Sequence, residues 1–272
     1  MLPTKDELIE LLKTKSSVQI KFTKKTTGEE RVMMATLNRD VLAQAVSAAA
    51  GIGYRAFDTA QMYGNEADTG AALRATGLPR EALCITTKVR PENYSDARFM
   101  ASVEQSLKDL QLDQVDILLL HWPDPSGDIA PSLRLLQQAQ DQGLARNIGV
   151  SNFTAKMMRA ARSLVDAPLV TNQVEFHPLL NQNTLLAAAT ETGIPLSSYC
   201  SVARGEVFRY PLFAQIGAGY GKSAAQVVLR WHIERGDIVF PKSIHPQRMK
   251  ENFEIFDFEI NDEEIEALTA LD

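Results

Sequence analysis

Short β-branched runs alternate with longer amphipathic stretches from Asp40 to the end of the chain, and this alternation limits the possible folds more than any other feature. Seven runs have the composition of strands: Tyr54–Thr59, Leu83–Val89, Val115–Trp122, Asn147–Ser151, Leu169–Phe176, Pro195–Ser201 and Asp237–Ser243. Amphipathic stretches with helical periodicity accompany them, several ending in a glycine that would end a helix: residues 39–51, 66–77, 97–111, 132–143, 155–165, 182–193 and 223–236. The alternation is typical of βα units and predicts a parallel sheet covered by helices.

The number of these units favours a closed barrel. Seven repeats of about 30 residues need one more strand to complete an eight-stranded barrel. Val32–Leu37 (VMMATL) is the only candidate early enough in the chain. An open doubly wound sheet would usually contain fewer units and a glycine-rich turn after its first strand. The sequence contains no linker-like or low-complexity stretch, so it predicts an α/β fold with a single domain, a (β/α)8 TIM barrel.

The first 38 residues do not follow the alternation. A helical pattern covers Lys5–Lys13, and two β-like runs follow around a Thr27-Gly28 turn, which predicts a hairpin. We expect this N-terminal helix and β-hairpin to cover the floor of the barrel. Residues 1–38 would then supply or replace the first barrel strand, and residues 39–272 would form the rest of the barrel.

Charge and cysteine content exclude several classes of protein. The chain has 28 basic and 34 acidic residues, a net charge of −6, and no block of like charges, so a nucleic-acid partner is not expected. Cys84 and Cys200 lie in separate apolar runs and suggest no disulfide framework. No apolar run approaches the roughly 20 residues that span a bilayer, and the start of the chain has no signal-peptide core. We therefore expect a cytoplasmic protein without a membrane partner.

Polar side chains stand at the carboxyl ends of three predicted strands. Asp58, Lys88 and His121 each end a strand, and Tyr63 follows Asp58 by five residues. Barrel enzymes place their catalytic groups at these ends. Each residue alone has an ordinary structural explanation, as a helix cap, a surface charge or a core aromatic. Together they predict one catalytic site at one mouth of the barrel.

The chemistry of such a group follows from its charges. Free tyrosine titrates near pH 10, and an ammonium within about 4 to 6 Å favours the phenolate. We therefore expect Lys88 to lower the pKa of Tyr63, and Asp58 to hold Lys88 in place and keep it protonated. His121, as a neutral donor, would orient a substrate carbonyl. The group could then protonate an oxygen that gains negative charge as hydride arrives at its carbon.

Several motifs, in their proper order, resemble the aldo-keto reductase family, most closely its bacterial 2,5-diketo-D-gluconate reductases. They are GYRAFDTAQMYGNE, ITTKV, LLLHWP, IGVSNF, NQVEFHP and FPKSIHPQRMKENFEIFDF, and they span most of the chain after Asp40. The resemblance implies NADPH-dependent reduction of aldehyde or ketone groups, such as keto-sugars, α-keto esters and small aldehydes. It implies the roles already given to Asp58, Tyr63, Lys88 and His121. Residues 1–38 are atypical for the family, because the glycines that usually mark its first strand are missing.

The resemblance also implies a cofactor site. Residues expected on the nicotinamide are Ser151, Asn152 and Gln173, which would bond its carboxamide, and Tyr199, which would stack on its ring. Residues expected on the adenosine phosphate are Lys242, Ser243 and Arg248, with Glu251 and Asn252 on the adenine. A lysine and an arginine around a helix start suit a dianionic phosphate, so NADP(H) is preferred over NAD(H). Turn capping and an exposed basic helix start are the plain structural alternatives.

The substrate pocket is expected to be open and apolar. Its candidate walls are Leu37, Met62, Tyr94 and Trp122, since aromatic and aliphatic surfaces supply binding area. The four histidines show no ligand spacing, so no metal is expected. We expect a monomer that takes a small carbonyl substrate. The alternative is an NADPH-binding sensor or scaffold with little or no catalysis, which the altered first strand alone favours.

Overall fold

The structure is a computed structural model, which describes the backbone of residues 18–23 and 30–35 and all of residues 39–272. The predicted helix Lys5–Lys13 and the predicted pocket residue Leu37 lie outside the described residues. Within the described part, no helix is both long and apolar enough to cross a bilayer.

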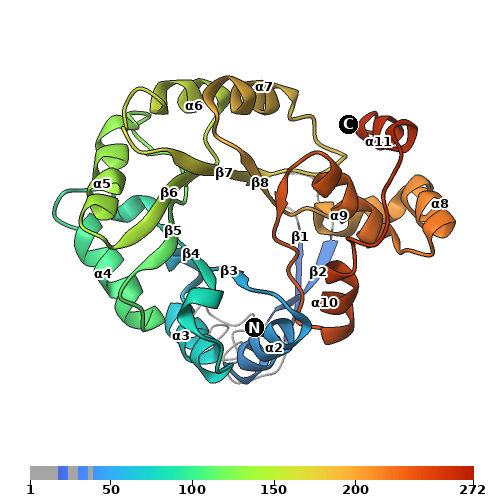
Figure 1. Cartoon of the computed structure of the whole chain (residues 1–272), viewed down its shortest axis with the longest axis horizontal. Helices are drawn as coiled ribbons and strands as arrows, with labels where there is room; N and C mark the ends of the chain where they lie inside the picture. The colour runs from blue at the N-terminus through green and yellow to red at the C-terminus, as the bar shows by residue number, and fades with distance from the viewer. Residues whose placement is uncertain (1–17, 24–29, 36–38) are drawn as a thin grey trace.

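Seven parallel strands form one sheet in which each strand pairs with its neighbours in chain order. They are β3 (Ala56–Asp58), β4 (Cys84–Val89), β5 (Val115–Leu120), β6 (Ala145–Ser151), β7 (Leu169–Glu175), β8 (Leu196–Tyr199) and β9 (Ile238–Val239). Each lies in one of the seven predicted runs, except that β6 begins two residues early. The sheet is curled, and the helices cover its outer face (Figure 1). The parallel α/β prediction is therefore confirmed.

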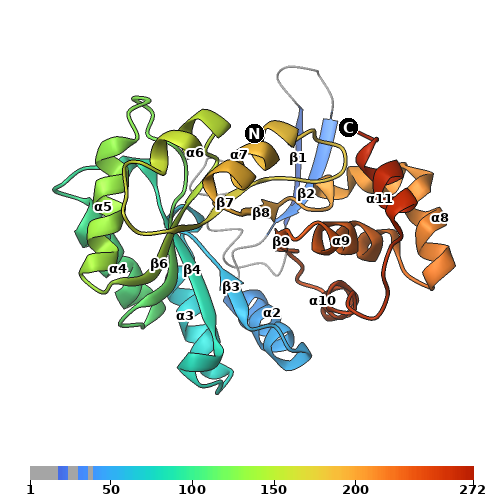
Figure 2. The same ribbon diagram turned by 45° about the horizontal axis from the view of Figure 1, so that its top comes forward.

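Helices follow most of the strands. Those that match predicted amphipathic stretches are α2 (Arg39–Ile52), α3 (Glu66–Ala75), α4 (Phe99–Leu110), α5 (Ala130–Asp141), α6 (Ala155–Ala161), α7 (Asn183–Thr192) and α9 (Ala224–Glu234). Three more are α8 (Pro211–Tyr220), α10 (Pro246–Phe253) and α11 (Asp262–Thr269), which lie on the same side of the molecule as α9 (Figures 1 and 2). Short 3-10 turns are η1 (Gln61–Tyr63), η2 (Arg80–Ala82), η3 (Pro91–Asn93) and η4 (Ala203–Arg209).

The N-terminal hairpin is present, but its strands do not pair with the described strands of the parallel sheet. Strands β1 (Val18–Thr23) and β2 (Glu30–Ala35) pair antiparallel with each other. The predicted eighth barrel strand, Val32–Leu37, falls partly in β2, whose partner is β1. In the described residues, β3 and β9 are the two edges of the seven-stranded sheet. The closed eight-stranded barrel is therefore not confirmed, although the curled sheet and its helices are those of such a fold.

The alternation of side chains along β4 separates the core from the inner face of the sheet. Ile85 and Val89 join the apolar core beneath the helices, so Lys88 points to the opposite, inner face. Parallel pairing sets Lys88 beside Leu119 on β5, and Leu119 in turn lies beside Gly149 on β6. A Cβ atom at Gly149 would lie 2.8 Å from a methyl carbon of Leu119. The inner face is therefore tightly packed at this level, just below the carboxyl ends of the strands.

Candidate functional site

A buried lysine joins the ends of β3 and β4. The side chain of Lys88 is 0% exposed, and its Nζ donates to Asp58 Oδ2 at 2.5 Å and to the backbone oxygen of Thr59 at 3.0 Å. A third, longer hydrogen bond of 3.4 Å reaches the hydroxyl of Tyr63. Asp58 ends β3, and Tyr63 ends the η1 turn that follows. The structure thus brings Asp58, Tyr63 and Lys88 together, and the three donors of the ammonium all have partners.

His121 completes the group from the end of β5. Its ring lies edge-on against Tyr63, with ring centroids 5.6 Å apart and an interplanar angle of 86°. Its buried Nδ1 has no hydrogen-bond partner among the described residues. Burial, followed by the positive charge of Lys88, lowers the pKa of His121 to about 4. His121 is therefore neutral at pH 7, as the donor role requires.

The expected lowering of the Tyr63 pKa is wrong for this structure. Burial, followed by the negative charge of Asp58, raises the pKa of Tyr63 to about 12. The Tyr63 side chain is 45% exposed, but its hydroxyl faces the fully buried Nζ of Lys88, where desolvation of a phenolate is costly. Burial also lowers the pKa of Lys88, while Asp58 raises it and so favours its charged form. The charge of Lys88 is therefore largely compensated by Asp58.

The depressed pKa of His121 predicts a pH-dependent stability. Between about pH 6.5 and pH 4 the unfolded chain binds a proton at His121 that the folded protein does not bind. The free energy of unfolding should therefore fall as the pH falls through this window, and His121 should contribute no pH dependence above it. Urea unfolding at pH 7.5 and pH 5 measures the effect. His121→Gln should reduce the difference between the free energies of unfolding at the two pH values. His245→Gln, at an exposed position, should leave this difference unchanged. Equal pH dependence in the wild type and His121→Gln would contradict the prediction.

The residues predicted to contact the nicotinamide form one hydrogen-bonded chain at the ends of β6, β7 and β8. Ser151 Oγ donates to the backbone oxygen of Gln173 at 2.7 Å, and Asn152 Nδ2 donates to Ser151 Oγ at 3.1 Å. Tyr199 donates its hydroxyl proton to Asn152 Oδ1 at 2.8 Å. Gln173 Nε2 donates to Asp58 Oδ1 at 3.0 Å, which connects this chain to the lysine pair.

The residues predicted to hold the adenosine phosphate lie at and after the end of β9. Lys242 and Arg248 are exposed, and within residues 39–272 neither forms an ion pair. Ser243 Oγ accepts the backbone N–H of His245 at 3.0 Å, just before α10 begins. Glu251 and Asn252 are half-buried in the later turns of α10. Two free cations beside a helix start form a suitable place for a phosphate.

The predicted pocket residues differ in their exposure to solvent and in their hydrogen bonds. Met62 is 49% exposed and Trp122 is 45% exposed, so both present apolar surface to solvent. Tyr94 is half-buried, and its hydroxyl donates to the backbone oxygens of Trp122 at 2.9 Å and Val89 at 3.1 Å. Tyr94 therefore fastens the segment after β5 to the end of β4.

A second layer of polar residues behind Lys88 was not predicted. Thr87 Oγ1 donates to Glu66 Oε1 at 2.6 Å, and Ser106 Oγ donates to Glu66 Oε2 at 3.2 Å. Gln61 Nε2 donates to the same Ser106 Oγ at 3.1 Å. One signal in the sequence could have indicated this layer. Thr87 is next to Lys88 in the strand and therefore faces the helices, where its hydroxyl needs a buried hydrogen-bond partner.

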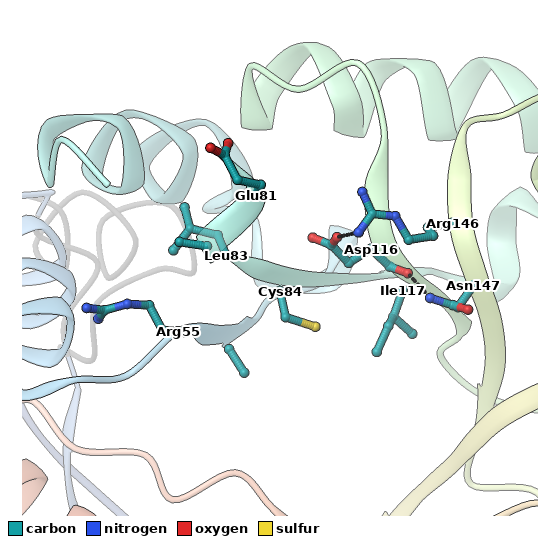
Figure 3. Close-up of a pocket in the computed structure, with 10 residues that line it drawn as sticks. Arg55, Glu81, Leu83, Cys84, Asp116, Ile117, Arg146 and Asn147 are labelled. Atoms are coloured by element: carbon teal, nitrogen blue, oxygen red, sulfur yellow. Dashed lines mark hydrogen bonds and ion pairs between the residues drawn. The ribbon is translucent and has the colours of Figure 1, made fainter. Parts of the chain in front are cut away.

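A cleft of about 350 Å³ lies at the other end of the sheet, where β4, β5 and β6 begin (Figure 3). Its central carboxylate, Asp116, accepts the backbone N–H of Ile85 at 2.8 Å and pairs with Arg80 at 2.8 Å and Arg146 at 3.2 Å. The carboxylate of Asp116 is thus paired with two arginines. Because Lys88 and His121 stand at the carboxyl ends of the strands, this cleft is not part of their site. Among the described residues, no group of three histidine, cysteine or acidic side chains could hold a metal ion.

Comparisons with known proteins give consistent results. The sequence profile of the aldo/keto reductase family matches residues 23–272. The chain is 43% identical to the methylglyoxal reductase DkgA of Yersinia pestis over 232 residues, which are 84% of this chain and 83% of that protein. A solved structure of a candidate 2,5-diketo-D-gluconic acid reductase B matches this chain with a TM-score of 0.84 at 43% identity. The match covers 86% of this chain and 84% of that protein. The structure of a Bombyx mori aldo-keto reductase in complex with NADP matches with a TM-score of 0.79 at 33% identity. That match covers 86% of this chain and 83% of the Bombyx mori protein.

Proposed function

Because the chain belongs to the aldo/keto reductase family, we propose that it reduces aldehyde or ketone groups to alcohols with NADPH, and that Tyr63 donates the proton. The observation that carries the proposal is the contact between Lys88 and Tyr63. The Lys88 ammonium is held by Asp58 and Thr59 and lies 3.4 Å from the Tyr63 hydroxyl. An ammonium at this distance stabilises a phenolate that forms there.

The raised pKa of Tyr63 gives the phenol a definite role in this reaction. With a pKa of about 12, Tyr63 carries its proton throughout the physiological range and cannot act as a base. The hydride for the carbonyl carbon would come from NADPH bound at this site. The carbonyl oxygen gains negative charge and takes the proton of Tyr63, which leaves an alcohol and a phenolate beside Lys88. The neutral imidazole of His121, T-shaped against Tyr63, would donate a hydrogen bond that orients the same oxygen.

The residues present fit a dinucleotide phosphate. Amide and hydroxyl groups converge at the ends of β6 to β8, close to Asp58 through Gln173. At α10, Lys242 and Arg248 are exposed cations without an acidic partner in residues 39–272. We infer that Lys242, Ser243 and Arg248 hold the 2′-phosphate, with Glu251 and Asn252 near the adenine, while Tyr199 stacks on the nicotinamide.

Removing the two exposed cations should change the choice of cofactor. We expect Lys242→Ala with Arg248→Ala to raise the Kd for NADPH by about 100-fold, because each charge-assisted phosphate contact contributes about 1.5 kcal/mol or somewhat more. The Kd for NADH should change by less than about threefold, since NADH lacks the 2′-phosphate. Fluorescence titration measures both constants. Lys250→Ala is the matched control, because Lys250 lies on the same helix and pairs with Glu254 at 3.6 Å. An equal loss of affinity for NADPH and NADH would contradict the assignment of Lys242 and Arg248 to the 2′-phosphate.

The substrate is proposed to be a small carbonyl compound, such as a keto-sugar, an α-keto ester or methylglyoxal. Met62 and Trp122 offer exposed apolar surface beside the site, and Tyr94 supports the segment that carries Trp122. The test follows the absorbance of NADPH with a panel of these carbonyl compounds. Oxidation that depends on the carbonyl supports the reductase. Tight NADPH binding without oxidation across the panel would instead favour a sensor or scaffold.

A further inference from the structure

Gln61 has more polar contacts than any residue named so far. Its Nε2 donates to the backbone oxygen of Ser102 at 3.1 Å, to Ser102 Oγ at 3.2 Å and to Ser106 Oγ at 3.1 Å. Its Oε1 accepts the backbone N–H of Arg90 at 3.1 Å and Asn93 Nδ2 at 2.9 Å. One amide therefore ties the η1 turn both to α4 and to the segment that follows β4.

This amide acts on the same two segments that carry the proposed acid and its ammonium. Gln61 opens the η1 turn that Tyr63 closes, and Arg90 lies two residues beyond Lys88. On the other side of the turn, Lys88 Nζ donates to Asp58 and Thr59. The turn is thus fastened to the end of β4 at two points, one before Gln61 and one at its side chain.

The ring of Tyr63 contacts His121, but its hydroxyl is held by one long hydrogen bond. Its side chain is 45% exposed, and in residues 39–272 its hydroxyl has no hydrogen-bond partner other than Lys88. A flexible turn would therefore let the hydroxyl move away from the ammonium. The half-buried amide of Gln61, with both its nitrogen and its oxygen satisfied, removes that freedom.

We propose that Gln61 is a positioning residue, which sets the distance between the Tyr63 hydroxyl and the Lys88 ammonium by clamping the η1 turn to α4 and to the end of β4. The inference rests on the proposed function, because it concerns the transfer of a proton from Tyr63. A misplacement of about 1 Å in a proton donor can cost about 100-fold in rate. We expect the binding of substrate and NADPH, in contrast, to change little when this contact lengthens.

Gln61→Met tests the proposal, because methionine keeps the length of the side chain and loses its hydrogen bonds. We expect kcat for methylglyoxal to fall by about 10- to 100-fold, while KM and the Kd for NADPH change by less than about threefold. The solvent deuterium isotope effect on kcat should rise, since proton transfer becomes more strongly rate-limiting. Gln105→Met is the matched control, because Gln105 is exposed on α4 and bonds only Asp109 within the described residues. Rates are normalised to the number of NADPH-binding sites.

The outcomes separate this inference from the proposed function. Turnover in the wild type with an undiminished kcat in Gln61→Met would overturn the inference alone. A loss that disappears after normalisation would overturn it too, because Gln61 would then act only in folding. If Gln61→Met does not fold, Asn93→Ala removes one partner of Oε1, and a kcat lowered by about threefold with an unchanged KM is expected; an unchanged kcat there would overturn the inference. No turnover in the wild type would overturn the proposed function and this inference with it.

Discussion

Tyr63→Phe is expected to lower kcat for carbonyl reduction by about 1,000-fold and to leave the Kd for NADPH within about twofold of the wild type. The change removes one oxygen atom, which carries the proton that the proposed reaction needs. The aromatic ring stays and keeps its edge-on contact with His121. Steady-state rates from NADPH absorbance and a fluorescence titration of NADPH measure the two quantities on the same preparation.

A second tyrosine provides the control for this substitution. Tyr220 donates its hydroxyl proton to Glu264 at 2.6 Å, between α8 and α11 and away from the strand ends. Tyr220→Phe also removes a hydrogen-bonded phenol, and its kcat should stay within about twofold of the wild type. A Tyr63→Phe variant that turns over as fast as the wild type would exclude Tyr63 as the proton donor. A parallel loss of NADPH binding would show that the ring or its hydroxyl serves binding instead.

Lys88→Met is expected to affect both activity and stability. It removes the cation that stabilises the phenolate, so kcat should fall by about 1,000-fold. It also leaves the carboxylate of Asp58 without its cation in a place where little water reaches it. Breaking one side of a buried ion pair costs about 3 kcal/mol or more, so the free energy of unfolding should fall by about that amount. Urea denaturation, followed by far-UV circular dichroism, measures it.

The double variant Asp58→Asn with Lys88→Met separates the two effects. With the uncompensated charge gone, the free energy of unfolding should recover by about 1 to 2 kcal/mol relative to Lys88→Met, because contacting residues are not additive. Activity should stay low, since the ammonium is still missing. Recovery of turnover in the double variant would mean that the charge of Lys88 is not needed for the reaction. Full stability in Lys88→Met would mean that the pair is not important for folding.

The parallel sheet could be predicted because the apolar pattern that indicates each strand lies within the strand itself. Largely apolar runs such as Val115–Leu120 can be buried on both faces, and parallel strands covered by helices have this property. The eighth strand was harder to assign. Residues 30–35 have the same β-like composition, but a strand pattern does not tell which neighbour it pairs with, and here it pairs with β1. In general, the pairing of a strand depends on turn geometry as much as on its apolar residues.

The proximity of Asp58 and Lys88 followed from strand ends and side-chain alternation, which any parallel sheet imposes. The pKa of Tyr63 did not follow, because it is a sum of burial and several charges whose distances no sequence spacing provides. The expectation counted Lys88 and omitted both the burial of the hydroxyl and the nearby Asp58. The Gln61 contacts could not be predicted either, since the partners of Gln61 lie 29 to 45 positions further along the chain.

The position of Asp58 on β3 has a consequence for how the molecule would lose its activity. β3 has three residues and, among the described strands, pairs only with β4. Edge strands open at lower free energies than central ones, so fraying of β3 needs no disruption of the apolar core around β5 and β6. Such a local opening takes Asp58 away from Lys88 and uncouples the ammonium from its anchor. This local opening would be enough to stop the proposed reaction, whereas denaturation requires the loss of the whole sheet.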